Sequence, residues 1–253
     1  MTSKRCTAVV LAAGNGSRMK SSVAKQFMLL NGKPLVCYAL QAMEDSEIID
    51  GCILVTGQSD IDYVQREIVE KYRFRKVEAV IPGGSERCLS VAGALREAER
   101  RGLFDYDGYI FIHDGARPFL TQEILDRTYD GVRKHHACVA AVPAKDTIKI
   151  ADPEGFAATT PARSLLWSIQ TPQVFDAGLI LKAYARLMEK EEELRRRGIQ
   201  VTDDAGVVEM FTDTRVKLVE GSYENIKITT PEDLVIAESM LHFRRNSGNE
   251  IPK

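Results

Sequence analysis

The chain has 253 residues, which allows one large α/β domain or two small ones, and its hydrophobic content of 44% is ordinary for a protein with a sizeable core. A formal net charge of -2 excludes a global attraction to nucleic acid or to anionic membranes, so any anion site must be local. No apolar run approaches the roughly 18 residues that a membrane span requires. The five cysteines are dispersed and lack CxxC spacing, which indicates buried thiols in a reducing cytoplasm.

The first element is an unbroken apolar run at residues 6–13, which predicts a strand buried on both faces of a parallel sheet. It ends in a glycine turn at residues 14–16, where bare N–H groups can approach a ligand, and Arg18 and Lys25 add positive charge beside it. This pattern indicates a polyphosphate site, with a plain strand-to-helix turn as the alternative. Met19 stands where the dinucleotide fingerprint requires glycine, and the chain has no P-loop Gly-Lys-Ser/Thr.

Strand-like and helix-like segments then alternate. We expect helices at residues 34–43, 60–72, 85–101 and 122–135, and strands at residues 52–56, 77–81 and 109–113. Repeated strand–helix units predict right-handed crossovers and an α/β fold, a mostly parallel sheet flanked by helices. Ligands of such sheets bind beyond the carboxyl ends of the strands, so the loops after residues 13, 81 and 113 should share one face.

The alternation breaks after Val142. Residues 143–170 are rich in proline and lack a helical period, which predicts a projecting β-arm. A helical pattern resumes at residue 176, a short strand is expected at residues 225–229, and Thr230-Pro231 with Asp233 marks the start of the last helix. We expect a single domain over residues 1–243, which includes the arm, and a disordered tail over residues 244–253.

Two further loops carry chemistry. Gly83-Gly84-Ser85 opens a helix and could hold the edge of a base or ribose, or be a turn with a serine N-cap. Asp114 and Arg117 flank a glycine at a strand end, where the acid could organise a ribose or a phosphate-bound metal and the base an anion. A structural Asp–Arg pair is the alternative. The sequence shows no Ser-His-Asp, HExxH or Cys-His arrangement.

Seven motifs in this order resemble a known family. They are AAGNGSRM at residues 12–19 with Lys25-Gln26, GGSER at 83–87, HDGARP at 113–118, DTIK at 146–149, TPQ at 171–173, TDD at 202–204 and NIK at 225–227. The chain resembles the 2-C-methyl-D-erythritol 4-phosphate cytidylyltransferases of the non-mevalonate isoprenoid pathway, from Thr7 to about Leu241. Ala24 and Gly115 depart from the proline and alanine that are common in the family.

The resemblance implies a Rossmann-like nucleotidyltransferase fold and a cytoplasmic enzyme that transfers CMP from CTP to methylerythritol phosphate. It implies Arg18 and Lys25 as catalytic residues. The CTP-binding residues would be Ala12, Ala13, Gly14, Asn15, Gly16, Lys25, Gly84, Ser85, Ser90, Asp114 and Gly115. Arg163 and Lys227, helped by Thr147 and Arg117, would position the acceptor.

Family members are homodimers with interlocked arms, so the resemblance also implies a homodimer in which acceptor-positioning residues come from the partner subunit. It implies Mg²⁺ held mainly by the CTP phosphates, with no protein metal ligand assigned. We expect no nucleic-acid or membrane partner. The two reactants, CTP and the acceptor phosphate, are both anions. Cations that bind each of them reduce their repulsion, so the reaction needs no covalent enzyme intermediate.

Two rival functions remain. A pentitol-phosphate cytidylyltransferase, such as one for ribitol 5-phosphate, would share the fold, although residues 142–149, 166–167 and 202–205 look like the methylerythritol enzyme. A nucleotide-binding regulator without turnover would tolerate loss of Arg18 or Lys25, yet both are present.

Overall fold

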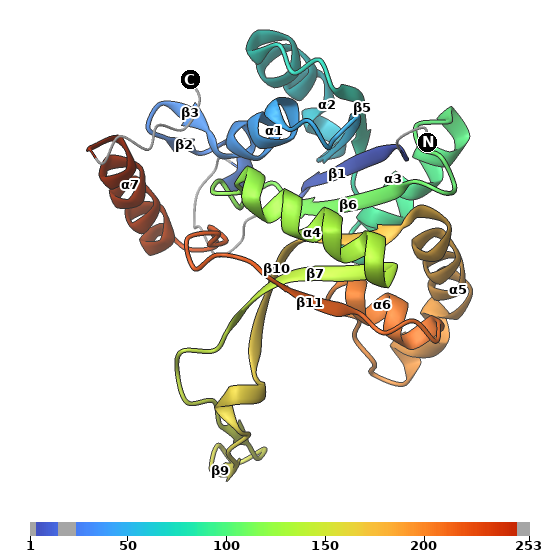
Figure 1. Ribbon diagram of the computed structural model, residues 1–253, viewed down its shortest axis with the longest axis vertical. Coiled ribbons are helices and arrows are strands. Elements are labelled where there is room, and N and C mark those ends of the chain that lie inside the picture. The colour runs from blue at the N-terminus through green and yellow to red at the C-terminus, as the bar shows by residue number, and fades with distance from the viewer. Residues whose placement is uncertain (1–3, 15–23, 247–253) are drawn as a thin grey trace.

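A mostly parallel sheet forms the centre of the computed structural model, which describes residues 4–14 and 24–246. Within these residues the sheet has seven strands in the order β11-β7-β10-β6-β1-β4-β5 (Figure 1). They are β1 (Cys6–Ala12), β4 (Gly51–Thr56), β5 (Val77–Pro82), β6 (Tyr109–Asp114), β7 (Ala137–Pro143), β10 (Trp167–Asp176) and β11 (Lys217–Glu220). Only the pairings of β10 with β6 and β7 are antiparallel in this sheet. The predicted α/β class is confirmed.

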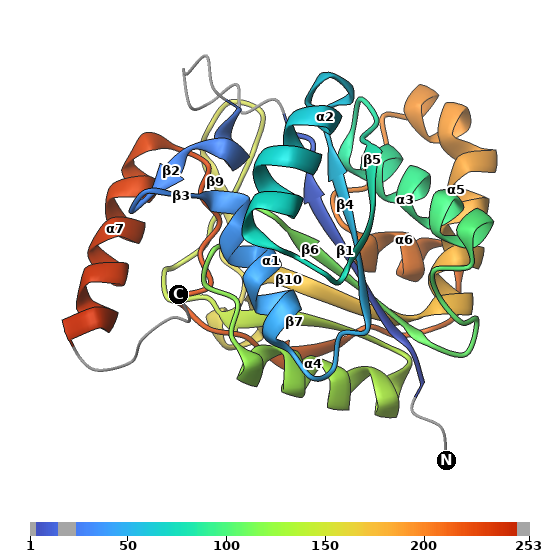
Figure 2. The same ribbon diagram turned by 90° about the horizontal axis from the view of Figure 1, so that it is seen from above.

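Helices cover both faces of the sheet (Figure 2). The central strand β1 is mostly apolar because both of its faces are covered. Ala8 and Val10 pack into one layer and Val9 into the other, all with no exposed surface. One layer contains α1 (Leu35–Asp45), α2 (Ile61–Tyr63) with the following π-helix η4 (Val64–Glu70), and α4 (Gln122–His135). The other contains α3 (Arg87–Arg101), α5 (Ala177–Arg196) and α6 (Asp204–Phe211).

A third apolar cluster lies at the side of the sheet, where the hairpin of β2 (Leu29–Leu30) and β3 (Lys33–Pro34) packs with α7 (Pro231–Asn246). The predicted start of this last helix is confirmed by a reciprocal cap. Asp233 Oδ2 accepts from Thr230 N at 2.9 Å, and Thr230 Oγ1 accepts from Asp233 N at 3.4 Å. The helix continues past the predicted boundary at residue 243, and the remaining tail residues 247–253 lie outside the described residues.

The predicted arm projects away from the sheet (Figure 1). It contains β8 (Ile150–Ala151), β9 (Ala157–Thr159) and the 3-10 turn η5 (Arg163–Leu165), and it returns along the first half of β10. Its side chains are nearly all exposed, including the large apolar residues Phe156 and Leu165 at 69% and 79%.

One local prediction was wrong. Residues 225–229 form no strand, because their main-chain bonds make no strand ladder: Asn225 N and Ile226 N donate locally to Ser222 O and Glu224 O, and Ile228 N donates to Ala116 O at 2.9 Å. The predicted helix at residues 60–72 is confirmed, although its middle part, η4, has the wider π winding. No helix in the described ranges is long and apolar enough to cross a membrane.

Candidate active site

A pocket of about 210 Å³ opens at the carboxyl ends of the central strands. The loops that follow β1, β5 and β6 meet there, as the sequence predicted for the three loops with unusual residues. Two segments from elsewhere complete it: η2 (Lys25–Phe27) and the loop before α7. The lining residues are Leu11, Ala12, Ala13, Gly14, Lys25, Gln26, Gly84, Ser85, Glu86, Arg87, Ser90, Asp114, Ala116 and Lys227.

Glycines allow the β5–α3 loop to lie against the end of β1. A Cβ atom on Gly83 would clash with Ala13 Cβ, and one on Gly84 would lie only 2.6 Å from Leu89 Cβ. Ser90 then fixes the loop, because its hydroxyl accepts from Gly84 N and donates to Glu86 O, both at 3.0 Å. The close approach places Gly14 and Gly84 in the same pocket wall.

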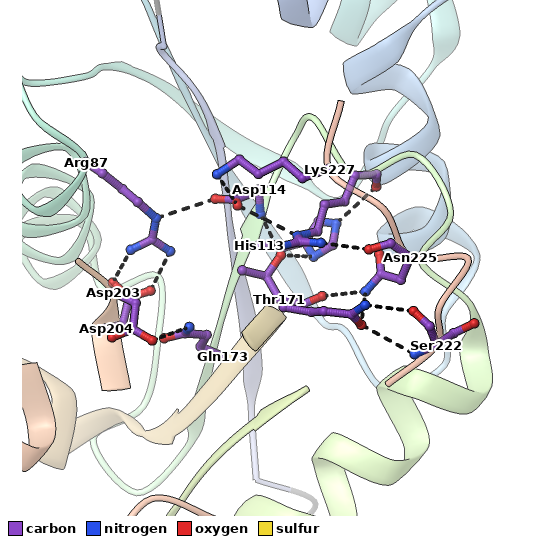
Figure 3. A network of polar contacts seen from close by, with 12 residues as sticks. Arg87, His113, Asp114, Thr171, Gln173, Asp203, Asp204, Ser222, Asn225 and Lys227 are labelled. Atoms are coloured by element: carbon purple, nitrogen blue, oxygen red, sulfur yellow. Dashed lines mark hydrogen bonds and ion pairs between the residues drawn. The ribbon is translucent and has the colours of Figure 1, made fainter. Parts of the chain in front are cut away.

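Asp114, at the end of β6, is the centre of a cluster of cations (Figure 3). Lys227 Nζ lies 2.7 Å from its Oδ2, Arg87 Nε lies 3.4 Å from its Oδ1, and Arg117 Nε lies 3.8 Å from Oδ2. Burial alone would raise the pKa of Asp114, but the charges of Arg87, Lys227 and Arg117 hold it well below its ordinary value. The carboxylate is therefore ionised at neutral pH.

Arg87 also binds Asp204, which is the first residue of α6 and has no exposed surface. Its Nη1 and Nη2 donate to Asp204 Oδ1 and Oδ2 at 2.9 and 2.6 Å, and Tyr184 OH donates to Oδ1 at 2.6 Å. Burial and the Asp204 charge raise the pKa of Tyr184 well above its ordinary value, so the phenol remains a donor.

A neutral layer lies beneath Asp114. His113 is fully buried, with Nε2 at 3.3 Å from Arg117 O and Nδ1 at 3.0 Å from Thr171 Oγ1. A carbonyl can only accept, so Nε2 carries the proton and Nδ1 accepts from the hydroxyl. Burial lowers the pKa of His113 to about 4, and the imidazole is neutral. Thr171 Oγ1 in turn accepts from Asp114 N at 3.1 Å.

The loop that carries Lys227 is anchored in this layer. Asn225 has no exposed surface; its side-chain Nδ2 donates to Thr171 O at 2.8 Å, and its main-chain O accepts from Arg117 Nη1 at 2.7 Å. Gln170 Nε2 adds a bond to Ser222 O at 2.7 Å. These contacts fix the backbone near Lys227 and so define where its ammonium reaches the pocket.

Most of the residues that the resemblance assigned to CTP surround the pocket. The pocket is lined by Ala12, Ala13, Gly14, Lys25, Gly84, Ser85, Ser90 and Asp114. Gly115 follows Asp114 outside this lining, and its N–H donates to Leu11 O at 2.8 Å. Asn15, Gly16 and Arg18 lie outside the described residues. Ala24, where the family commonly has proline, has a φ of -58°, which proline also adopts.

The acceptor-positioning candidates are not all brought together within one chain. Lys227 lines the pocket, and Arg117 is buried behind Asp114 with 9% exposure. Thr147 and Arg163 lie on the arm outside the pocket lining, and Arg163 Nη1 donates to Lys145 O at 3.2 Å.

Sequence reasoning assigned no role to Arg87, Asp204, Tyr184 or Asn225. Arg87 and Asp204 stood inside the quoted motifs GGSER and TDD, the first of them at a glycine turn. Nothing in the spacing of one sequence links those two motifs. Their pairing depends on how α3 and α6 pack on the same face of the sheet.

The mostly parallel sheet, with its first strand leading to Gly14 in a cation-lined pocket, defines a Rossmann-like nucleotidyltransferase. Residues 6–243 match the family described as 2-C-methyl-D-erythritol 4-phosphate cytidylyltransferase, and the chain belongs to this family.

Relatives of that name agree over nearly the whole chain. The protein from Lachnospira eligens is 48% identical over 91% of this chain and 96% of its own length, and that from Lachnoclostridium phytofermentans is 44% identical over 94% and 97%. The crystal structure of 4-diphosphocytidyl-2C-methyl-D-erythritol synthase from Anaerococcus prevotii has a TM-score of 0.78 at 33% identity, covering 94% of this chain and 96% of that one.

Proposed function

We propose that this protein transfers CMP from CTP to the phosphate of 2-C-methyl-D-erythritol 4-phosphate, giving 4-diphosphocytidyl-2-C-methyl-D-erythritol and pyrophosphate. Family membership supports the reaction. The observation that carries it is that Lys25, beside the β1 glycine turn, and Lys227, before α7, line one cavity. A reaction between two phosphate anions requires cations for both partners in one site.

In this reaction a phosphate oxygen of the acceptor attacks the α-phosphorus of CTP, and pyrophosphate leaves on the opposite side. Residues 12–16, with Gly84, Ser85 and Ser90 at the base and Asp114 and Gly115 near the ribose, hold the nucleotide. Lys25 and Arg18 stabilise the negative charge that grows on the triphosphate. Lys227 holds the acceptor phosphate in line, which removes the need for an enzyme nucleophile.

Magnesium belongs to the same proposal. Among the described residues, no group of three or more His, Cys, Asp or Glu side chains has the arrangement of a metal site. The residues that line the pocket would therefore suit an ion held by triphosphate oxygens and water, with lysine and arginine side chains balancing the remaining charge. When bound, the ion would act as a Lewis acid that offsets negative charge on the triphosphate and so favours attack on the α-phosphorus.

The arm supports a homodimer with composite sites. Six large apolar side chains are 36% or more exposed on it: Ile148, Ile150, Phe156, Leu165, Trp167 and Ile169. Apolar surface gathered on a projection is typical of an interface, and Thr147 and Arg163 would then reach the partner's pocket. Leu165→Asp should give a monomer with little turnover in sedimentation and activity assays. Phe243→Asp, at an equally exposed residue of α7, should remain a dimer.

We place the reaction in the cytoplasm. All five cysteines are free, and burial raises the pKa of Cys6, Cys37 and Cys138 to about 12. Such thiols remain protonated, and they need no oxidising compartment to complete the fold.

Pyrophosphate release from CTP tests the function. Methylerythritol phosphate should support release, and omission of the acceptor should abolish it. Release with ribitol 5-phosphate instead would favour the pentitol-phosphate activity, and CTP binding without release under any condition would favour the regulator.

A further inference from the structure

Arg87 bridges two carboxylates that come from different elements of the site (Figure 3). It is the first residue of α3, and its guanidinium reaches Asp204 through both Nη atoms and Asp114 through Nε. Asp114 lines the pocket, whereas Asp204 is fully buried and belongs to α6. Arg87 therefore connects a buried anchor to a group at the ligand cavity.

The anchor itself is fixed from three directions. Asp204 accepts from Tyr184 of α5 in addition to both Nη atoms of Arg87. The preceding residue, Asp203, accepts from Gln173 Nε2 of β10 at 3.0 Å, and Gln173 Oε1 accepts from Ala205 N at 2.9 Å. The start of α6 is thus tied to the sheet and to α5, and Asp204 has little freedom to move.

The other side of the Asp114 carboxylate faces Lys227. Arg87 occupies Oδ1, while Lys227 Nζ at 2.7 Å and Arg117 Nε at 3.8 Å face Oδ2. The rotation of this carboxylate about its last bond sets the direction in which Oδ2 meets the ammonium. A donor fixed at Oδ1 restricts that rotation.

We propose that Arg87, held by Asp204, is a positioning residue that orients the Asp114 carboxylate and, through it, the Lys227 ammonium. The assignment of Lys227 to an acceptor phosphate rests on the proposed function, whereas the bridge from Asp204 to Asp114 does not. An arginine suits this task because its planar fork offers donors in two directions, and a lysine ammonium cannot bind both carboxylates in the same geometry.

Arg87→Lys is the sharpest test because it keeps the positive charge beside two buried acids and removes only the fork. Arg5→Lys is the matched control, since Arg5 also bridges elements, with Nη2 at 2.6 and 2.7 Å from the Glu78 oxygens and Nε at 3.0 Å from Leu103 O. Each substitution is made in the wild type, and Arg87→Lys is also combined with Asp114→Asn. Thermal unfolding of all variants shows which are folded.

Arg87→Lys should lower kcat/KM for the acceptor about 10- to 100-fold, the order expected when a site group is misplaced by about 1 Å. Arg5→Lys should change it less than about twofold, as expected for a surface ion pair. In the Asp114→Asn background, Arg87→Lys should have little further effect, because the group it orients is already gone. A purely structural role would give the same loss in both backgrounds, and that result would overturn the proposal.

Calorimetric CTP titration of the wild type, Arg87→Lys, Asp114→Asn and the double variant separates this inference from the proposed function. If the wild type binds CTP but releases no pyrophosphate, the proposed function is wrong. The coupling between Arg87 and Asp114 can then still be measured from the CTP affinities. Arg87→Lys should weaken CTP binding in the wild type and not in Asp114→Asn. Equal weakening in both, or none in either, would contradict the proposal.

Discussion

Lys227 Nζ lies 2.7 Å from Asp114 Oδ2, so the loop before the last helix is joined to the end of central strand β6 inside the pocket. Lys227 is 35% exposed and Asp114 is 10% exposed at the side chain. The pair thus places a cation at the rim of the cavity, where an incoming phosphate can share it with the carboxylate. Lys25 lines the same cavity from the segment that follows β1.

Lys227→Ala should raise the acceptor KM or lower kcat, with a total loss of kcat/KM of about 10- to 100-fold, the size of a hydrogen bond to a charged group. CTP affinity should change far less, because the glycine loops and Lys25 remain. Lys227→Arg should restore activity only in part, since a planar fork replaces a compact ammonium. Acceptor kinetics and CTP calorimetry check this, with Lys217→Ala on β11 as the control. Collapse of CTP binding at constant acceptor KM would show the assignment to be wrong.

Lys25→Ala should lower kcat by about 10²- to 10³-fold, the usual effect of losing a donor that stabilises transition-state charge. The melting temperature should stay close to that of the wild type. Lys71→Ala, which removes an exposed lysine paired with Glu67 on the helix surface, should leave kcat unchanged. Turnover of Lys25→Ala near the wild-type level would remove Lys25 from the mechanism. Arg18→Ala is expected to behave like Lys25→Ala.

Gly84→Ala should weaken CTP binding and lower stability, because the new methyl would lie 2.6 Å from Leu89 Cβ and push the loop out of the pocket wall. Gly93→Ala is the control in α3, where an added Cβ meets nothing within 4 Å. This control should stabilise the protein by about 0.5–1 kcal/mol through helix propensity. Denaturant unfolding and CTP titration measure both effects, and equal behaviour of the two variants would refute the packing argument.

Much of the fold was visible in the sequence. The strands β1, β4 and β6 are mostly apolar runs because both of their faces are covered, and such a run can be recognised in the sequence before its neighbouring strands are known. Their carboxyl-end loops could therefore be placed at one edge. The fold and function were also stated from the family resemblance, which supplied what periodicity alone could not.

Other features depend on contacts that no local pattern encodes. Ile226 and Ile228 alternate with polar residues as a strand would, yet both pack into the α7 cluster while the backbone is held by side chains. The Arg87–Asp204 bond joins the starts of α3 and α6, which are 117 residues apart in sequence and meet through the packing of both helices on the sheet. A buried ion pair of this kind requires the tertiary structure to be seen.

His113 should make stability depend on pH. Its pKa is lowered by burial from 6.5 to about 4, so between these values the unfolded chain binds more protons than the folded one. The contribution of neutral His113 to the free energy of unfolding is fully present above its unfolded-state pKa of 6.5, and it is lost as the pH falls toward 4. Between about pH 7 and pH 5 the free energy of unfolding should drop by about 2 kcal/mol from His113.

The measurement is denaturant unfolding at several pH values in the wild type and in His113→Gln. The variant should show a shallower loss over this interval, since ordinary carboxyl groups titrate mostly below it. Identical slopes in the two proteins would mean that His113 is not the neutral buried group described here.

The central claim is that this pocket joins CMP to methylerythritol phosphate in preference to other alcohol phosphates. A direct competition measures it: CTP, Mg²⁺ and equal amounts of methylerythritol 4-phosphate and ribitol 5-phosphate react in one vessel, and the two cytidine diphosphate products are quantified by ³¹P NMR. We predict that the methylerythritol product dominates from the first turnovers and that Lys227→Ala reduces its formation. Dominance of the ribitol product, or no product despite CTP binding, would contradict the account.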